Sequence, residues 1–213
     1  MIHCTNKNVY TNEPIDAMAS WQRAVKRLID IVGGCVGCVL FLPAIVLAYF
    51  IIRIKGGRHV IFRQERIGYR GRPFVIYKFR TMSETADVDV PELASDDDCR
   101  LAPWGKFLRD HHLDELPQLW NVIKGEMSLV GPRPEQKYFV DRILQHDARY
   151  VYLYQMRPGL TSKATLYNGY ADTMEKMLRR LDMDIEYLKT RSLRLDFIII
   201  IETLIPFLKG KKI

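Results

Sequence analysis

Cysteine is scarce in this 213-residue sequence, which contains only Cys4, Cys35, Cys38 and Cys99. So few cysteines, without the spacing of a secreted scaffold, exclude a disulfide framework. Cys35 and Cys38 form a C-x-x-C pair, but the pair lies inside an apolar run with no second pair and no nearby histidine. We therefore expect no zinc site there and interpret both cysteines as small side chains of a membrane-type helix.

The sequence also lacks a signal peptide and an internal repeat. Residues 1–19 are polar and irregular, and the apolar segment that follows starts too late, is too long and has no small-residue cleavage pattern. We expect residues 1–19 to be a loose or docking segment. Hydrophobic residues make up 48% of the chain and charged residues 27%, which excludes a disordered chain and a polytopic membrane protein. One domain with appendages is expected at this length.

Charge is distributed unevenly along the chain. The net charge is +7, and residues 20–82 hold twelve Lys or Arg against only Asp30 and Glu65. Such a basic block suits anionic lipid, phosphorylated ligands or nucleic acid, and composition does not choose among them. Residues 83–100 are acidic and include a D-x-D string at Asp87–Asp89. Because short D-x-D strings are common, we interpret this stretch as a solvated loop.

An uncharged, mostly apolar run of 22 residues extends from Ile31 to Ile52. At about 1.5 Å per residue it is just long enough to cross a hydrocarbon core of roughly 30 Å. Pro43 lies in its middle and favours a kink, and basic residues flank both ends, which favours keeping both on the cytoplasmic side. We therefore predict a re-entrant helix that is kinked at Pro43 and dips into one leaflet, in preference to a straight span or a buried helix.

Downstream of this run, the patterns predict a mixed, helix-rich α/β fold. Alternating residues and a turn signal indicate a small β-hairpin within residues 59–82, with a basic surface that suits phosphate or lipid headgroups. Helical periodicity marks residues 136–149 and residues 173–191, the second as an amphipathic helix. Residues 197–208 are very apolar but too short to span a membrane, so core packing or contact with the membrane surface is expected.

The central segment, residues 104–135, carries two adjacent carboxylates, Asp114 and Glu115. Apolar residues follow at helical spacing, and Gly125 supplies a stop signal. Pro117 fits only a first helical turn, so we predict that Asp114 lies at or next to the N-cap of this helix. On spacing alone, Asp114 is a helix cap and Glu115 is a partner of the helix dipole.

The residues around the pair favour phosphate chemistry. A helix N-terminus keeps an aspartate ionised and attracts phosphate, so Asp114 is available as a nucleophile or a metal ligand. Arg109 precedes the pair, Arg133 is fixed between two prolines, and Lys78 and Arg80 come from the basic hairpin. Because a carboxylate and a phosphate must meet, Mg²⁺ is expected to offset their repulsion. Together with the membrane anchor, these groups suit phosphoryl transfer to or from a lipid phosphate.

Four motifs follow one another from the hairpin onward. They are K-F-R-T-M at residues 78–82, L-D-E-L-P-Q-L-W-N at 113–121, G-E-M-S-L-V-G-P-R-P at 125–134 and R-P-G at 157–159. In this order they resemble the bacterial sugar transferases, the small monotopic polyprenyl-phosphate phosphoglycosyl transferases. The resemblance runs from about Arg23 to the C-terminus, and the chain has about the size of the family's minimal catalytic form.

The resemblance implies a two-step reaction. Asp114 attacks the β-phosphorus of a UDP-sugar and expels UMP, and polyprenyl phosphate, usually undecaprenyl phosphate, then takes the phosphosugar from the aspartyl intermediate. Glu115 corresponds to the second member of the pair, an acid/base or metal-orienting group, and Mg²⁺ is expected on Asp114. Arg109 matches a phosphate-contacting residue, and Arg133 belongs to the P-R-P element. The predicted substrate- and phosphate-binding residues are Lys78, Arg80, Arg109, Arg133 and Arg157.

The resemblance also implies an organisation and a location. We divide the chain into an N-terminal segment (1–19), a re-entrant membrane helix (20–56) and a membrane-associated catalytic domain (57–213), in which amphipathic interfacial helices surround a compact core. The expected location is the cytoplasmic face of the bacterial inner membrane. The expected partners are UDP-sugar, polyprenyl phosphate and one leaflet of the membrane, with no nucleic acid; the sequence sets neither the sugar nor the oligomeric state.

One departure from the family and two alternative functions stay open. Many members continue after R-P-G with a G-W-x-Q-V-x-G-R-like string, whereas this chain reads L-T-S-K-A-T-L-Y-N-G-Y at residues 160–170, so residues beyond Thr161 receive no role. A membrane-bound hydrolase of lipid or nucleotide phosphates would use the same groups with water as acceptor. A basic membrane or nucleic-acid binder would leave the Asp-Glu pair unexplained. His111 and His112 lack metal-ligand spacing, so we expect them to make structural hydrogen bonds.

Overall fold

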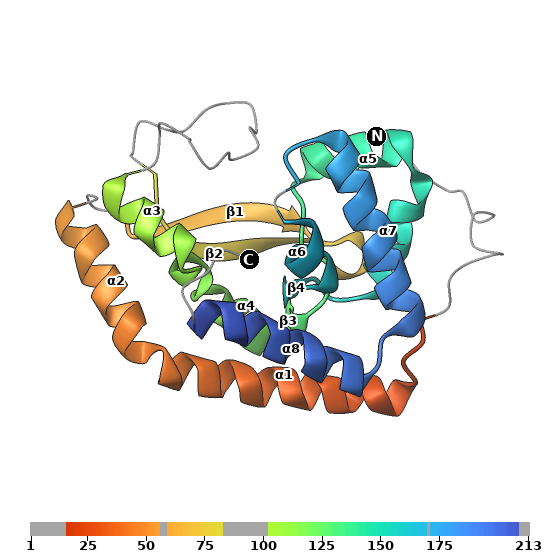
Figure 1. The fold of residues 1–213 in the computed structure, drawn as a ribbon, viewed down its shortest axis with the longest axis horizontal. Helices are drawn as coiled ribbons and strands as arrows, with labels where there is room; N and C mark the ends of the chain where they lie inside the picture. Colours follow the sequence, from red (N-terminus) through yellow and green to blue (C-terminus); the bar gives the residue numbers. More distant parts are fainter. Residues whose placement is uncertain (1–15, 56–58, 83–101, 170, 209–213) are drawn as a thin grey trace.

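A computed structural model describes residues 16–55, 59–82, 102–169 and 171–208 of the chain. Within them the fold is mixed and helix-rich, with one antiparallel and one parallel two-stranded sheet (Figure 1). The helices and strands, in chain order, are α1 Ser20–Leu40, α2 Leu42–Lys55, β1 Ile61–Ile67, β2 Pro73–Phe79, α3 Pro103–Asp110, α4 Gln118–Lys124, β3 Ser128–Val130, α5 Lys137–His146, β4 Gly159–Thr161, α6 Lys163–Asn168, α7 Met174–Thr190 and α8 Leu193–Leu208.

The long apolar run forms two helices, α1 and α2, which meet at Phe41 and are bent by 60°. Pro43 lies in the first turn of α2, where its missing N–H removes no helical hydrogen bond. The predicted bend within the apolar run is therefore confirmed, but the break lies at Phe41, two residues before Pro43. Among the described residues, no helix taken singly has the length and apolar character needed to cross a membrane, and α1 and α2 meet that condition only as a bent pair.

α1 packs closely against α4. A Cβ added to Gly34 would lie 2.9 Å from Cγ1 of Ile123, so the small residues of α1 allow the two helices to approach each other. The guanidinium of Arg27 donates hydrogen bonds of 2.7 Å to the carbonyls of Val122 and Ile123, at the C-terminal end of α4. The apolar run is thus joined to the helix that follows the Asp-Glu pair.

A buried carboxylate ties α1 to the parallel sheet. Asp30 is only 3% exposed and accepts hydrogen bonds of 2.9 Å from Oγ of Ser128 and from the backbone N–H of Leu129, both in β3. A buried acceptor is stabilising only when donors reach it, and here two do. Asp30 therefore fixes the position of α1 on β3.

The predicted β-hairpin is confirmed as β1 and β2, which pair antiparallel along their full lengths. Their turn contains Arg70 in the left-handed region, with φ 59°. Ile76 of β2 is buried, and Lys78 lies two residues later on the same face of the strand. Asn121 of α4 donates to the carbonyl of Val75 (2.7 Å) and so joins α4 to this strand. The hairpin thereby directs Lys78 toward the segment that precedes α4.

The parallel pair β3–β4 brings the G-P-R-P and R-P-G motifs together. The N–H of Gly159 donates to the carbonyl of Pro132 at 2.9 Å. A Cβ added to Gly159 would lie 2.1 Å from the backbone nitrogen of Gly131, so a residue with a side chain does not fit there. The two motifs form one unit, and this unit supports the loop that carries Arg133.

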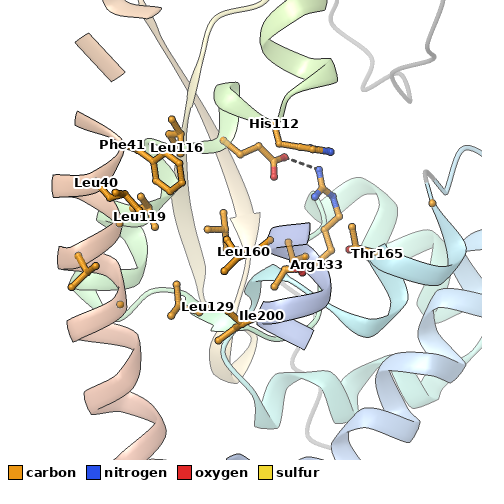
Figure 2. A pocket seen from close by; sticks show the side chains of 18 of the residues that line it. Leu40, Phe41, His112, Leu116, Leu119, Leu129, Arg133, Leu160, Thr165 and Ile200 are labelled. Carbon is orange, nitrogen blue, oxygen red and sulfur yellow. Dashed lines mark hydrogen bonds and ion pairs between the residues drawn. The ribbon is translucent and has the colours of Figure 1, made fainter. Parts of the chain in front are cut away.

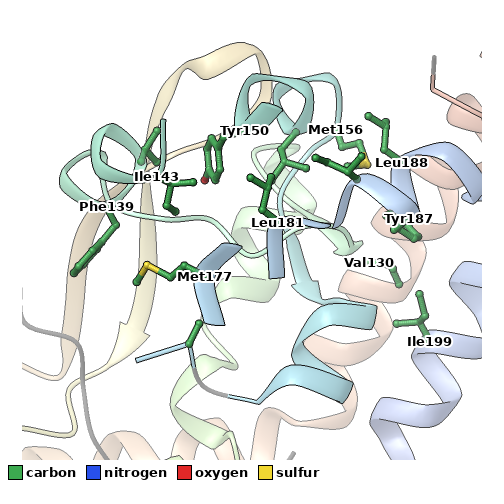
Figure 3. Close-up of a cluster of buried hydrophobic side chains, with 14 residues drawn as sticks. Val130, Phe139, Ile143, Tyr150, Met156, Met177, Leu181, Tyr187, Leu188 and Ile199 are labelled. Carbon is green, nitrogen blue, oxygen red and sulfur yellow. The ribbon is translucent and has the colours of Figure 1, made fainter. Parts of the chain in front are cut away.

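The largest hydrophobic cluster lies around α5, α7 and the 3₁₀ segment Ala148–Gln155 (Figure 3). α5 and α7 confirm the helices predicted at residues 136–149 and 173–191. The buried side chains labelled in Figure 3 are Val130, Phe139, Ile143, Tyr150, Met156, Met177, Leu181, Tyr187, Leu188 and Ile199.

α8 packs on the core with one face and leaves the other exposed. Ile199 is 1% exposed, whereas Phe197 is 65% exposed. Nζ of Lys26 lies 2.6 Å from a carboxylate oxygen of Asp196, which joins α1 to α8, and these helices line one edge of the molecule together with α2 (Figure 1). Exposed apolar side chains on α1 and α2 include Leu28, Val36, Leu40, Leu47, Phe50 and Ile54. Apolar surface of this extent is typical of a membrane or protein contact.

The end of the predicted N-terminal segment docks on the folded chain. Met18 is buried, the N–H of Ala17 donates to the carbonyl of Leu188 (3.1 Å), and Asp16 pairs with Arg191. For residues 16–19 this supports the docking alternative. The rest of that segment, and the acidic stretch with its D-x-D string, lie outside the described residues.

The core around α7 gives a stability prediction. Leu188 is fully buried, so Leu188→Ala removes buried methyl groups and leaves a cavity, which should lower the free energy of unfolding by about 2–5 kcal/mol. Lys189→Ala, at the next and exposed position of the same helix, is the control and should change it by less than about 0.5 kcal/mol. Denaturant unfolding in detergent measures both. Equal effects of the two substitutions would contradict the assigned core.

Candidate functional site

Asp114 and Glu115 lie in a 3₁₀ turn, Leu113–Glu115, that precedes α4. Pro117 is the N-cap of α4, so Asp114 stands three residues before the cap. The prediction that Asp114 lies at or next to the N-cap is therefore wrong. The physical reason is that the chain tightens into a separate turn before Pro117, and the helix begins only at Gln118.

Glu115 is held by two cations from other parts of the chain. Its Oε1 lies 2.6 Å from Nζ of Lys78 in β2 and 3.0 Å from Nη2 of Arg133 in the P-R-P loop. Burial of the carboxylate opposes its ionisation, but the attraction of Lys78 and Arg133 is larger and holds the pKa of Glu115 well below its usual range. Glu115 is thus a fixed anion that orients both cations.

Asp114 is in the opposite electrostatic situation. It is 7% exposed, and burial raises its pKa to about 6, aided by the negative charge of Glu115. Lys78, Arg109 and Arg133 act in the other direction but do not outweigh burial. Asp114 does not lie at the N-terminus of α4, and burial shifts its pKa upward, so ionisation of Asp114 is less favourable than the helix-dipole argument predicted. Two adjacent carboxylates end up with clearly separated pKa values.

Arg109, at the C-terminal end of α3, is oriented by the K-F-R-T-M motif. Its Nε donates to Oγ1 of Thr81 at 3.0 Å. The close approach of α3 to this motif depends on Gly105, because an added Cβ there would lie 2.0 Å from the carbonyl oxygen of Thr81. Arg109 is also one of the cations that act on Asp114. The structure therefore brings Lys78, Arg109 and Arg133 together around the Asp-Glu pair.

Arg157 lies elsewhere. Its Nε donates to the carbonyl of Gly125 at 2.9 Å, at the far end of α4, and its guanidinium stacks over the ring of Tyr69 at 5.2 Å. Both contacts stabilise the junction between the hairpin turn and the C-terminus of α4. The assignment of Arg157 to phosphate binding is not supported by its surroundings.

Arg80 lies just after β2, where its backbone N–H donates to the carbonyl of Val60 (2.9 Å). Its Nε is buried and has no hydrogen-bond partner among the described residues. Arg80 does not take part in the ion pairs at Glu115 that the structure describes. Its predicted role in substrate binding stays a prediction.

Several cations of the basic block face inward. Lys26 pairs with Asp196, and Arg66 lies 3.4 Å from Glu135. Arg27 donates hydrogen bonds to α4, and Lys78 pairs with Glu115. Part of the charge of this block thus stabilises the fold. Within the hairpin, which we interpreted as a surface for phosphates or headgroups, Arg66 and Lys78 form ion pairs with Glu135 and Glu115.

His111 makes the structural hydrogen bond that we predicted for both histidines, whereas Nε2 of His112 makes none among the described residues. His111 contacts the carbonyl of Phe107 through Nδ1 (2.9 Å), as expected. His112 has φ 51°, a left-handed conformation that is uncommon for a residue with a side chain, and its Nε2 is buried without a partner among the described residues. Burial lowers the pKa of His112, so its imidazole is neutral near pH 7. No local sequence pattern around His112 indicates this placement.

A cavity of about 320 Å³ opens beside Glu115 (Figure 2). Its walls are mostly apolar and come from α1, α4, α8 and the parallel sheet, whereas one end is polar. The apolar lining includes Val36, Leu40, Phe41, Leu116, Leu119, Leu129, Leu160, Ile200 and Leu204. The polar lining comprises His112, Glu115, Arg133, Thr161, Thr165, Arg180 and Thr203. This shape suits an amphiphile with an anionic head.

Arg180 is a cavity residue that the sequence patterns did not single out. It lies in α7, on the stripe that also carries Met177 and Leu181, and it is 8% exposed. A charged residue on the buried stripe of an amphipathic helix is itself unusual. This unusual position was the one feature of the sequence that could have indicated Arg180 as a functional residue.

The fit of Mg²⁺ to this site depends on Asp114. Among the described residues, no three His, Cys, Asp or Glu side chains could hold a metal by themselves. In phosphate-handling sites Mg²⁺ is commonly held by one or two carboxylates together with waters and substrate phosphates. Glu115 is engaged by Lys78 and Arg133, so Asp114 is the carboxylate that fits this role.

Comparison with known proteins identifies the family. The family model described as bacterial sugar transferase matches residues 21–210. The chain belongs to this family. The match includes the hairpin, the Asp-Glu pair, the G-P-R-P and R-P-G unit and the cavity described above.

Curated relatives of the chain are named as transferases. A UDP-N-acetylgalactosamine-undecaprenyl-phosphate N-acetylgalactosaminephosphotransferase of Aeromonas hydrophila is 37% identical over 186 residues, covering 87% of this chain and 44% of that protein. A UDP-glucose:undecaprenyl-phosphate glucose-1-phosphate transferase of Caulobacter vibrioides is 41% identical over 185 residues (84% and 67%), and one of Escherichia coli is 36% identical over 183 residues (85% and 39%). The chain thus spans between 39% and 67% of the length of these relatives.

The raised pKa of Asp114 predicts a pH-dependent gain in stability on substitution. The folded-state pKa of about 6 lies above the ordinary 3.8, so ionisation of Asp114 costs folding free energy; this cost grows from about pH 4 to about pH 6 and is constant above. Asp114→Asn should therefore raise the free energy of unfolding by about 1–3 kcal/mol at pH 8 and by much less at pH 4.

Denaturant unfolding at a series of pH values, in metal-free buffer, measures this difference. Asp182→Asn is the matched control, since Asp182 is 60% exposed in its side chain and should show no such pH-dependent gain. A gain for Asp114→Asn that is equal at pH 4 and pH 8 would contradict the assigned burial cost.

Proposed function

We propose that this chain is a phosphoglycosyl transferase that moves a sugar 1-phosphate from a UDP-sugar to polyprenyl phosphate and releases UMP. The observation that carries the proposal is the cavity of about 320 Å³, which is mostly apolar and is lined at its polar end by Arg133 and by Glu115, the residue that follows Asp114 in the chain. Such a cavity fits a lipid with a phosphate head. The names of the relatives, which act on UDP-sugars and undecaprenyl phosphate, agree with this substrate pair.

Asp114 is the proposed nucleophile. With a pKa of about 6, most of its carboxylate is ionised at neutral pH, yet it is buried and therefore less solvated than an exposed aspartate. One carboxylate oxygen forms a bond to the β-phosphorus while the bond from that phosphorus to the bridging oxygen breaks, and UMP leaves with this oxygen. A phosphate oxygen of the acceptor then attacks the same phosphorus and releases Asp114.

Glu115 is proposed to orient cations and not to donate a proton. Its pKa is held far below neutral by Lys78 and Arg133, so it carries no proton to give near pH 7. Through Oε1 it fixes Nζ of Lys78 and Nη2 of Arg133 beside Asp114. Both cations can then stabilise the charge that develops on the transferred phosphoryl group.

Mg²⁺ is proposed as the cofactor, with Asp114 as its protein ligand. Bound there, it would offset the repulsion between the carboxylate and the diphosphate. Arg109, positioned by Thr81, is proposed to contact the same phosphates, because it is one of the cations that act on Asp114.

We further propose that α1 and α2 form a re-entrant anchor in the cytoplasmic leaflet of a bacterial inner membrane. Support comes from the 60° bend and from the exposed apolar side chains of α1, α2 and α8. The ribbons of α1 and α2 follow the border of the molecule, and α8 lies beside α1 (Figure 1). With this edge in the leaflet, the cavity opens where a lipid acceptor is available.

The nucleophile is tested by Asp114→Asn. The variant should lose UMP release from UDP-sugar by at least about 10³-fold, because removal of a catalytic nucleophile commonly costs this much or more. A UMP-release assay across a panel of UDP-sugars, with and without polyprenyl phosphate, measures it, and mass spectrometry of the wild type should detect a phosphosugar on Asp114. Asp182→Asn serves as the exposed control.

Two outcomes of this assay would contradict the proposal. Full turnover by Asp114→Asn would exclude the aspartyl intermediate. Steady release of free sugar phosphate by the wild type without lipid would instead indicate a hydrolase.

The topology is tested by cysteine labelling in a variant whose four native cysteines are replaced by serine. Single cysteines at Ala19 and Lys55, at the two ends of the bent pair, should react with a membrane-impermeant maleimide only after the cells are permeabilised. A cysteine at Leu40, beside the bend and 68% exposed, should be protected by lipid in both conditions. Labelling of Lys55→Cys in intact cells would exclude the re-entrant arrangement.

A further inference from the structure

Arg180 presents a buried guanidinium to the polar end of the cavity. Its Nη1 donates to Oε1 of Glu135 at 2.8 Å, and its Nη2 donates to the carbonyl of Gly169 at 3.2 Å. Its Nε is buried and has no hydrogen-bond partner among the described residues. A buried charge-bearing donor without a partner is costly, so its position calls for a ligand or another explanation.

Glu135 does not account for the whole charge of Arg180. Oε2 of Glu135 also contacts Arg66, at 3.4 Å, so this one carboxylate serves two guanidiniums. Asp184, one turn further along α7, is fully buried, and burial raises its pKa to about 7, which leaves it only partly ionised at neutral pH. The surroundings of Arg180 therefore retain positive charge that a buried anion would balance.

The cavity indicates which anion would reach this position. Arg133 and Arg180 both line it, as do two hydroxyl-bearing residues, Thr161 of β4 and Thr165 of α6. The rest of the lining is apolar and comes largely from α1 and α8. Contact with such walls does not stabilise a bound hydrophilic nucleotide, whereas a lipid chain buries apolar surface against them and is stabilised. Two guanidiniums are well suited to the oxygens of one phosphate group.

We propose that Arg180 binds the phosphate of the lipid acceptor, together with Arg133, at the polar end of this cavity. The inference rests on the proposed function and names a residue for its second substrate. Arg180 is then a substrate-binding residue, and its contact with Glu135 holds the guanidinium in place in the absence of the acceptor.

Three variants test the inference. Arg180→Met removes the charge and keeps much of the volume, Arg180→Lys keeps the charge, and Arg179→Met changes the neighbouring, exposed arginine of α7 as the matched control. Each variant is assayed in nanodiscs for KM toward undecaprenyl phosphate. Each is also assayed, in the absence of undecaprenyl phosphate, for single-turnover UMP release from the UDP-sugar.

Arg180→Met should raise KM for the acceptor about tenfold or more, as expected for the loss of a charged hydrogen bond, and should leave single-turnover UMP release within about twofold of wild type. Arg180→Lys should recover part of the loss, and Arg179→Met should match wild type. An unchanged acceptor KM in Arg180→Met would overturn the inference. An equal loss of UMP release would also overturn it, because the arginine would then act on the donor or on the fold.

A binding measurement separates this inference from the proposed function. Farnesyl phosphate is titrated into wild type and Arg180→Met in detergent, and thermal unfolding midpoints are recorded in the same samples. Weaker binding in the variant, without a lower midpoint, supports the role of Arg180 even if the wild type transfers no sugar phosphate. Equal binding in both proteins overturns it, even if the wild type is an active transferase.

Discussion

The contact of Glu115 with Lys78 and Arg133 determines where the site forms. Lys78 comes from the hairpin, Arg133 from the loop after β3, and Glu115 from the turn before α4, so a single carboxylate oxygen joins three segments that are distant in the sequence. A buried carboxylate without such partners would cost several kcal/mol. Each of the three segments is therefore located by the same contact. The G-P-R-P and R-P-G unit stabilises this contact by fixing the position of the loop that carries Arg133.

The same contact makes two adjacent carboxylates chemically different. Burial acts on both, but the two cations lie against Glu115 and reach Asp114 only at longer range. The pKa of Glu115 is held well below its usual range, whereas that of Asp114 rises to about 6. Separated pKa values in a pair of titratable groups are a mark of divided roles. A fixed anion that organises cations and a less solvated, still ionisable carboxylate are what a nucleophilic mechanism requires.

Elements that depend on neighbouring residues could be predicted from the sequence, and contacts between distant residues could not. The bend just before Pro43 and the end of α4 at Gly125 follow from local chemistry, as does the hairpin. The N-cap prediction for Asp114 was wrong because a 3₁₀ turn and a helix share the same apolar spacing over so few residues. The contact of Arg157 with the carbonyl of Gly125 could not be predicted, because the two residues are 32 positions apart in the sequence. Arg180 was missed because it falls on the buried, mostly apolar stripe of α7, where helical spacing predicts core packing and not ligand binding.

The helix α1, which belongs to the proposed membrane anchor, also contributes to the geometry of the site. The polar ties of α1 lie in its N-terminal half, where Arg27 holds α4 and Asp30 holds β3. Its C-terminal half, from Gly33 to Leu40, forms a wall of the cavity and exposes apolar side chains outward. One helix thus exposes apolar side chains on one side and lines the cavity with the other. Under the proposed function, a lipid acceptor can enter the cavity by lateral movement and keep its chain among apolar groups throughout, so the anchor itself lowers the cost of bringing the acceptor phosphate to Asp114.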